Sequence, residues 1–169
     1  RLRARRAALE LFAAADAEWI VKNADALAGF VGIISVDDGT RRGLIDLLAN
    51  IGDAKTARAV MERVPLDRSS GVTMGREFLA GRPASHVTDL LKHPRSTIRR
   101  VAVLSLGKRL GEEGVVAKML ERLNDTSAPV VQAIVATASA SEQRGLAVGL
   151  LAKEAQKEGP RRVRAVELL

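Results

Sequence analysis

Apolar residues recur at helical spacing along most of the chain. Between His93 and Asp125, one set of small or apolar residues follows the spacing i, i+3, i+4, i+7, i+8: Ile98, Val101, Ala102, Ser105 and Leu106. A second set follows Gly111: Val115, Val116, Met119, Leu120 and Leu123. Such spacing places each set on one face of a helix. Gly111 and Gly114 bracket a short turn between the sets, so the stretch predicts a helical hairpin.

The hairpin pattern recurs about every thirty residues. When the pattern is shifted forward by one repeat, Val130 aligns with Ile98, and after a further shift Val163 aligns with the same position. Backward, a helix is expected over about 40–51, then a turn at Gly52-Asp53 and a helix over 54–64. A weaker pair follows, whose first helix we expect Gly71 and Gly75 to loosen. The predicted units are 1–36, 37–66, 67–93, 94–125, 126–158 and a partial unit at 159–169.

One helical hairpin per short repeat is typical of an α-solenoid. We therefore predict an all-α fold of about five stacked hairpins, forming a single repeat domain over residues 1–169. The stretch GFVGIISV at 29–36 is rich in β-branched residues, which favour strands. We interpret it as the end of a helix that runs into a loop, because an isolated strand would have no partner.

Three local features repeat with the hairpins: turns, a Val/Ile-Arg pair near the start of the first helix, and Leu-Gly before the second. They are clearest in STIRRVAVLSLGKRLGEEGVVAKMLERLND and in PRRVRAVELL. In these features the chain resembles HEAT-like repeats of the short prokaryotic type found in the phycobilisome-lyase family. It departs from them at Val131, where the family often has arginine. The resemblance implies a right-handed superhelix whose second helices line a concave face that holds a partner.

Composition narrows the class of protein. The apolar fraction of 47% is enough for a packed core, and no uncharged stretch reaches the length of a membrane span. The chain has no cysteine, which fits a reducing compartment, so we expect a cytoplasmic protein. The start at Arg1 and the end in VRAVELL suggest a piece of a longer chain, whose remainder is a further contact candidate.

The sequence offers little for catalysis. Its two histidines, His86 and His93, are accompanied by no cluster of further metal ligands. No motif for a phosphate-binding loop, a zinc protease or a serine nucleophile is present. We therefore expect no catalytic residue, metal or cofactor. A repeat domain that assists an enzyme acting on a partner is a remote alternative.

Arginines cluster near the start of the first helices, in a chain with a formal net charge of +7. The candidates for phosphate contacts are Arg5, Arg6, Arg41, Arg42, Arg99, Arg100, Arg161, Arg162 and Arg164. If they align on one exposed face, they would bind nucleic acid through phosphates. Alternatively, they pair with turn carboxylates such as Asp37, Asp38 and Asp125 and form structural ladders. The scarcity of aromatic residues disfavours base stacking.

The second helices carry charges of both signs opposite their apolar stripes. The candidates for partner contacts are Lys55, Arg58, Glu62, Lys118, Glu121 and Arg122. Mixed charge suits a protein surface better than a phosphate track. The uncharged stretch 126–141 is expected to be buried between helices. We therefore predict a non-catalytic module that binds a protein or peptide on its concave surface, with nucleic-acid binding as the alternative.

Overall fold

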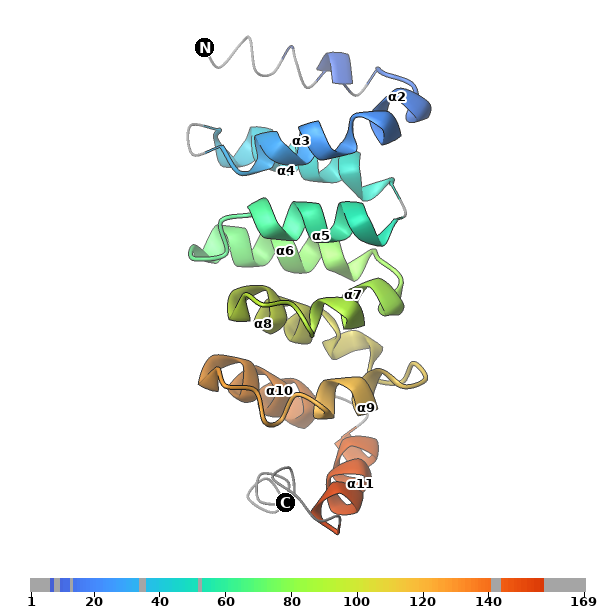
Figure 1. The fold of residues 1–169 in the computed structure, drawn as a ribbon, viewed down its shortest axis with the longest axis vertical. Coiled ribbons are helices and arrows are strands. Elements are labelled where there is room, and N and C mark those ends of the chain that lie inside the picture. The colour runs from blue at the N-terminus through green and yellow to red at the C-terminus, as the bar shows by residue number, and fades with distance from the viewer. Residues whose placement is uncertain are drawn as a thin grey trace. The chain divides into compact units, whose positions relative to one another are not determined.

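The computed structural model describes residues 7, 10–12, 14–33, 36–51, 53–140 and 144–156 (Figure 1). Within these residues the regular elements are all helices. They are α2 (Ala17–Lys22), α3 (Ala24–Val31), α4 (Asp38–Ala49), α5 (Ala54–Arg63), α6 (Ser69–Ala80), α7 (Ala84–Leu90), α8 (Ser96–Ser105), the 3-10 helix η1 (Gly107–Arg109), α9 (Val115–Leu120), α10 (Ala128–Ala140) and α11 (Arg144–Ala155).

The chain divides into two compact units, residues 1–82 and 83–169. We call them the N-terminal unit and the C-terminal unit. The division lies between α6 and α7, inside the repeat predicted at 67–93.

In both units the helices form two layers. In the N-terminal unit α3 packs on α4 and α5, and α4 packs on α6. In the C-terminal unit α7 packs on α8 and α9, α8 packs on α10, and α11 packs on α9 and α10. We call α4 and α6, or α8 and α10, the first-helix layer of their unit, and α3 and α5, or α7, α9 and α11, the second-helix layer. This arrangement confirms the prediction of an all-α fold of the α-solenoid type.

The predicted periodicity is visible in the burial of side chains. Four buried positions of α4 reappear in α6 after a shift of 30 residues: Arg41, Leu44, Ile45 and Leu48 correspond to Gly71, Met74, Gly75 and Phe78. Most of the buried positions of α8 reappear in α10 after a shift of 32 residues. The uncharged stretch 126–140 was expected to be buried, and this holds for one face of α10 only, because Gln132, Ala136 and Ala140 on the other face are exposed.

Aspartates begin three of the helices. Asp16, Asp37 and Asp53 are the N-caps of α2, α4 and α5, and their carboxylates accept the backbone N–H three residues later at 2.7–2.9 Å. In the last two, the hydroxyl of Thr40 or Thr56 also donates to the carboxylate, at 2.8 Å in both cases. These bonds satisfy backbone donors that the first turn of a helix leaves free.

The structure agrees with the prediction for the stretch 29–36 and contradicts the prediction for the helix after residue 67. The helix α3 ends at Val31 and passes into a loop, as expected for the stretch 29–36, of which residues 34 and 35 lie outside the described residues. The expectation that glycine loosens the helix after residue 67 is wrong. The helix α6 is regular, and both Gly71 and Gly75 are buried. A Cβ at residue 71 would overlap the carbonyl group of Pro65, so this glycine permits close packing.

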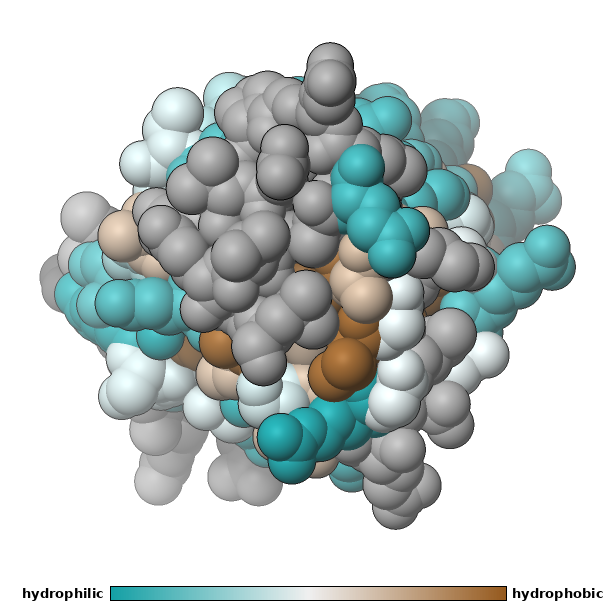
Figure 2. Space-filling view, turned by 90° about the horizontal axis from the view of Figure 1, so that it is seen from below, coloured by the Kyte–Doolittle hydropathy of each residue, from teal (hydrophilic) through white to brown (hydrophobic). Residues whose placement is uncertain are grey.

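None of the helices within the described ranges is long and apolar enough to cross a bilayer. Figure 2 views the molecule from the side of α11 and shows apolar residues at the surface beside hydrophilic ones. Val148 on α11 is one of the exposed large apolar residues, and most of the others lie between residues 11 and 33.

Candidate functional site

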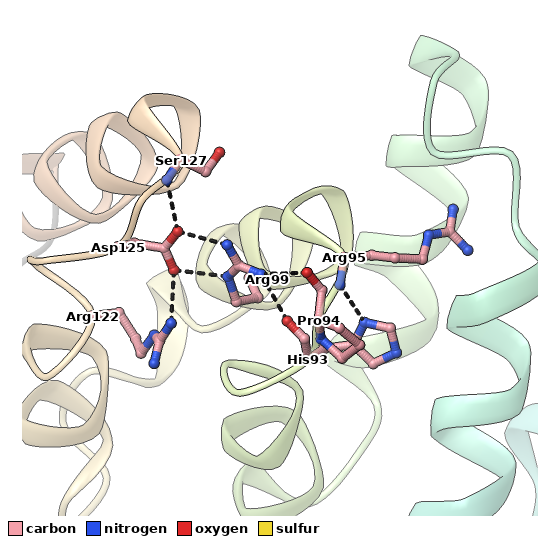
Figure 3. A network of polar contacts seen from close by, with 7 residues as sticks. All are labelled: His93, Pro94, Arg95, Arg99, Arg122, Asp125 and Ser127. Atoms are coloured by element: carbon pink, nitrogen blue, oxygen red, sulfur yellow. Dashed lines mark hydrogen bonds and ion pairs between the residues drawn. The ribbon is translucent and has the colours of Figure 1, made fainter.

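Arg99 on α8 lies in the interior of the C-terminal unit, where it makes four hydrogen bonds (Figure 3). Its Nε and Nη2 donate to the two carboxylate oxygens of Asp125 at 2.7 and 2.6 Å. Its Nη1 donates to the carbonyls of His93 and Pro94, both at 2.8 Å. The planar fork of arginine is suited to such bidentate binding of a carboxylate.

Asp125 is the centre of this cluster. Its side chain has no exposed surface. Besides Arg99, it accepts bonds at 2.9 Å from Arg122 Nη2 and from the backbone N–H of Ser127. Burial of the carboxyl group raises its pKa, but the hydrogen bonds from Arg99, Ser127 and Arg122 outweigh that effect and lower the pKa to about 2. The carboxylate is therefore held ionised inside the protein.

Arg41 on α4 occupies a corresponding position in the N-terminal unit. It is 2% exposed, and its donors reach the carbonyls of Val31, Ile33 and Val36 at 2.8, 3.2 and 3.1 Å. Its Nη1 also donates to Asp38 at 2.5 Å. The arginine thus satisfies carbonyls at the end of α3 and in the loop that follows, where no further helical turn provides donors.

These contacts correct the phosphate prediction for Arg41 and Arg99. Both guanidinium groups are buried and bonded within the protein, so neither faces a ligand. The ladder interpretation holds for Arg99 with Asp125 and for Arg41 with Asp38. The carboxylate of Asp37 caps the first turn of α4.

The other phosphate candidates differ in accessibility. Arg42 on α4 is exposed and pairs with Glu77 on α6 at 2.8 Å. The side chain of Arg100 on α8 is exposed and, unlike that of Arg99, forms no hydrogen bond or ion pair with a described residue. The remaining candidates lie outside the described residues: Arg5, Arg6, Arg161, Arg162 and Arg164.

Arg82, in the turn after α6, has a role that the sequence analysis did not predict. It is 3% exposed, donates to the carbonyl of Leu48 at 2.6 Å, and also bonds the carbonyl of Ile51. Its guanidinium carbon lies 4.4 Å from the ring centre of Phe78. Burial lowers its pKa, and the charge of Asp53 opposes this. The two carbonyls that Arg82 binds belong to residues more than thirty positions earlier in the chain, so no local sequence motif predicts these contacts.

The partner-binding candidates of α5 lie at the surface of the second-helix layer. Lys55 is 80% exposed in its side chain and pairs with Asp25 on α3 at 2.7 Å. That hydrogen bond raises the pKa of Lys55. Arg58 pairs with Glu62 at 2.9 Å, one helical turn later. Exposed pairs of this kind stabilise a fold by about 0–1 kcal/mol, so they can exchange for charges of a partner.

The candidates at α9 separate into two environments. Lys118 and Glu121 are exposed, and Lys118 Nζ lies 3.4 Å from the hydroxyl of Thr88 on α7. Arg122 instead turns toward the interior and binds Asp125. Arg122 therefore belongs to the buried cluster, and Lys118 and Glu121 to the surface.

The two histidines have different environments. His93 is buried, its Nδ1 accepts the backbone N–H of Arg95 at 3.1 Å, and its carbonyl accepts Arg99. His86 is half-buried on α7. Among the described residues no group of three or more His, Cys, Asp or Glu is placed to hold a metal ion.

Comparison with known proteins finds matches among solved structures. No protein-family model matches the chain, and no curated protein matches it. Among solved structures, the chain is similar to a designed armadillo repeat protein in complex with the peptide (KR)4. The identity is 15%, the TM-score is 0.37, and the match covers 99% of this chain and 92% of the designed protein.

Proposed function

We propose that this chain is a non-catalytic, cytoplasmic interaction module of HEAT-like repeats that binds a protein or peptide on the second-helix layer of each unit. The contact residues would be Lys55, Arg58 and Glu62 on α5, and Lys118 and Glu121 at α9. Repeat folds of this kind present extended surfaces built from successive helices.

One observation carries the proposal: Arg41 and Arg99 are withdrawn into the interior. A phosphate-binding stripe requires several cations on one exposed face, since each contributes through release of counterions. Without these two arginines, the described part of the proposed stripe retains Arg42, which is paired with Glu77, and Arg100. The second helices keep both positive and negative charges exposed, and this mixture suits electrostatic complementarity with a protein.

The test begins with a displayed library of random peptides, selected against the full chain. Selected peptides are labelled, and their affinity is measured by fluorescence anisotropy. We expect the double variant Lys55→Glu/Arg58→Glu to bind them about ten-fold more weakly, equivalent to about 1.4 kcal/mol. The matched control is Arg42→Glu/Arg76→Glu, which makes the same charge change on exposed positions of the first-helix layer. Equal loss in both variants would reject the second-helix layer as the binding surface.

Nucleic-acid binding is the second candidate, favoured by the net charge of +7 and by the exposed Arg100. Anisotropy with labelled duplex DNA and duplex RNA at about 50 and 200 mM salt distinguishes it, because several phosphate contacts make binding fall by orders of magnitude over this range. Tight binding with that salt dependence, lost in Arg42→Glu/Arg100→Glu, would replace the protein-binding proposal.

A further inference from the structure

The outer surface of the first-helix layer in the C-terminal unit is formed by two rows of residues. Each row has the sequence spacing i, i+4, i+8; the first row runs along α8 and into η1, and the second lies on α10. We call the six residues the α8–α10 outer face: Arg100, Leu104, Lys108, Gln132, Ala136 and Ala140. All are exposed except Leu104, which is half-buried.

The two rows lie side by side. The helices α8 and α10 pack on one another, and their main buried positions coincide after a shift of 32 residues. The same shift pairs Arg100 with Gln132, Leu104 with Ala136, and Lys108 with Ala140. A Cβ on Gly107 would lie 3.3 Å from the methyl group of Thr137, so the later parts of the two helices are also in contact.

This face differs in charge from the second-helix layer. Arg100 and Lys108 are the only charged residues at exposed positions of α8, η1 and α10, and both are cations. The nearby carboxylate of Asp125 is fully buried and bonded to Arg99 and Arg122. On the second-helix layer, by contrast, Lys55 and Arg58 are each paired with a carboxylate. No ion pair joins the side chain of Arg100 or Lys108 to a carboxylate of the described residues, and the nearby Glu112 pairs with Arg109.

The spacing and the neutral neighbours indicate a partner. Arg100 and Lys108 are eight residues apart along α8 and η1, which corresponds to roughly 12–14 Å along the two helices. Between and beside them lie Leu104, Ala136 and Ala140, whose side chains allow close approach of another backbone. Two cations are few for a nucleic acid, whose interfaces are densely positive. A protein helix with two carboxylates about seven residues apart, and apolar residues between them, matches both the charges and the apolar centre.

We propose that the α8–α10 outer face is a second docking surface, which binds an acidic amphipathic helix of a partner protein. Arg100 and Lys108 would pair with two carboxylates of that helix, and Leu104 and Ala136 would contact its apolar residues. This surface is separate from the second-helix layer, so the inference does not depend on the function proposed above.

The probe is a fluorescein-labelled, alanine-based helical peptide of about 20 residues, long enough to be partly helical in water. It carries Glu at i and i+7 and Leu at i+3 and i+4. A matched peptide has Gln in place of both Glu. Anisotropy is measured with the full chain, and circular dichroism checks that each variant stays folded. We expect the Gln peptide to bind about ten-fold more weakly, as two lost charge pairs would give.

The double variant Arg100→Glu/Lys108→Glu is expected to lose affinity for the Glu peptide by about ten-fold or more and to gain affinity for a peptide with Lys at both positions. The variant Arg42→Glu/Arg76→Glu is the control and should bind the Glu peptide within about two-fold of the parent, since these exposed residues belong to α4 and α6 and not to the α8–α10 outer face. The proposal is overturned by equal binding of the Glu and Gln peptides, by no binding of either, or by equal loss in both variants. Tight, salt-sensitive binding of duplex RNA or DNA lost with Arg100→Glu/Lys108→Glu would overturn it in favour of nucleic acid.

Discussion

The helices α6 and α8 solve the same packing problem in different ways. In each helix, a buried residue of the first turn contacts the loop that precedes the helix. In α8, Arg99 lies in the interior and donates to the loop carbonyls of His93 and Pro94. In α6, the buried Gly71 lies directly against the carbonyl of Pro65, which already accepts the backbone N–H of Arg68 at 3.1 Å.

The difference concerns which carbonyls need donors. After α7 the loop carbonyls accept hydrogen bonds from a buried arginine, whose charge requires a carboxylate to balance it. Where the loop satisfies its own carbonyl, no side chain is needed and close contact of the backbones suffices. One site therefore depends on charge, and the other on the absence of a Cβ.

The largest effect is expected from Asp125→Asn. This change leaves the buried Arg99 and half-buried Arg122 without their carboxylate, and breaking a buried ion pair costs about 3–5 kcal/mol. Urea unfolding would measure the loss, and hydrogen exchange should place it in α8 and α10. Glu77→Gln is the control, because it removes an exposed partner and should cost at most about 1 kcal/mol. Similar losses in both would contradict a special role for the buried cluster.

Gly71→Ala tests whether α6 needs the close contact between its backbone and the preceding loop. Its Cβ would overlap the carbonyl of Pro65, so the helix or the loop must shift, at a cost of about 1–3 kcal/mol. Thermal unfolding would measure the loss. Gly29→Ala in α3 is the matched control, because no atom lies near its Cβ position and alanine favours a helix by up to about 1 kcal/mol. A neutral Gly71→Ala would show that the close contact is not needed.

Acid should destabilise the buried cluster around Asp125 but not the contact between Gly71 and Pro65. The pKa of Asp125 is about 2 in the folded chain, below its value of about 3.9 in an unfolded chain. A depressed pKa stabilises the fold above the unfolded pKa, and this stabilisation is lost as pH falls from about 5 to about 2. The contribution is about 2–3 kcal/mol. Urea unfolding of Asp125→Asn should lack this part of the pH dependence, while Gly71→Ala should retain it.

The smallest effect is expected from the exposed pair on α5. Arg58→Ala/Glu62→Ala removes an ion pair between neighbouring turns, which contributes about 0.3–0.5 kcal/mol and is screened by salt. Thermal unfolding at low and high salt would measure the change. A loss as large as that of Asp125→Asn would mean that surface and buried pairs do not differ as argued here.

Much of the fold could be predicted from local patterns. The apolar spacing in α4, α5, α8 and α10 predicted helices close to the observed ones, because helical periodicity is a local property of the sequence. Gly71 was misjudged, since its value lies in contact with Pro65 and not in its own helix. Arg82 was missed for the same reason: the carbonyls that it binds are more than thirty residues away.

The sequence by itself determined the helices, their repeat and the presence of arginines near the starts of first helices. It left two roles open for those arginines, because an identical side chain can face water or carbonyls depending on what packs above it. Tertiary structure decided that Arg41 and Arg99 lie inside with carbonyls and carboxylates, while Arg42 and Arg100, one position later, lie outside. One residue turns a helix by about 100°, and only packing determines which of two neighbours is buried.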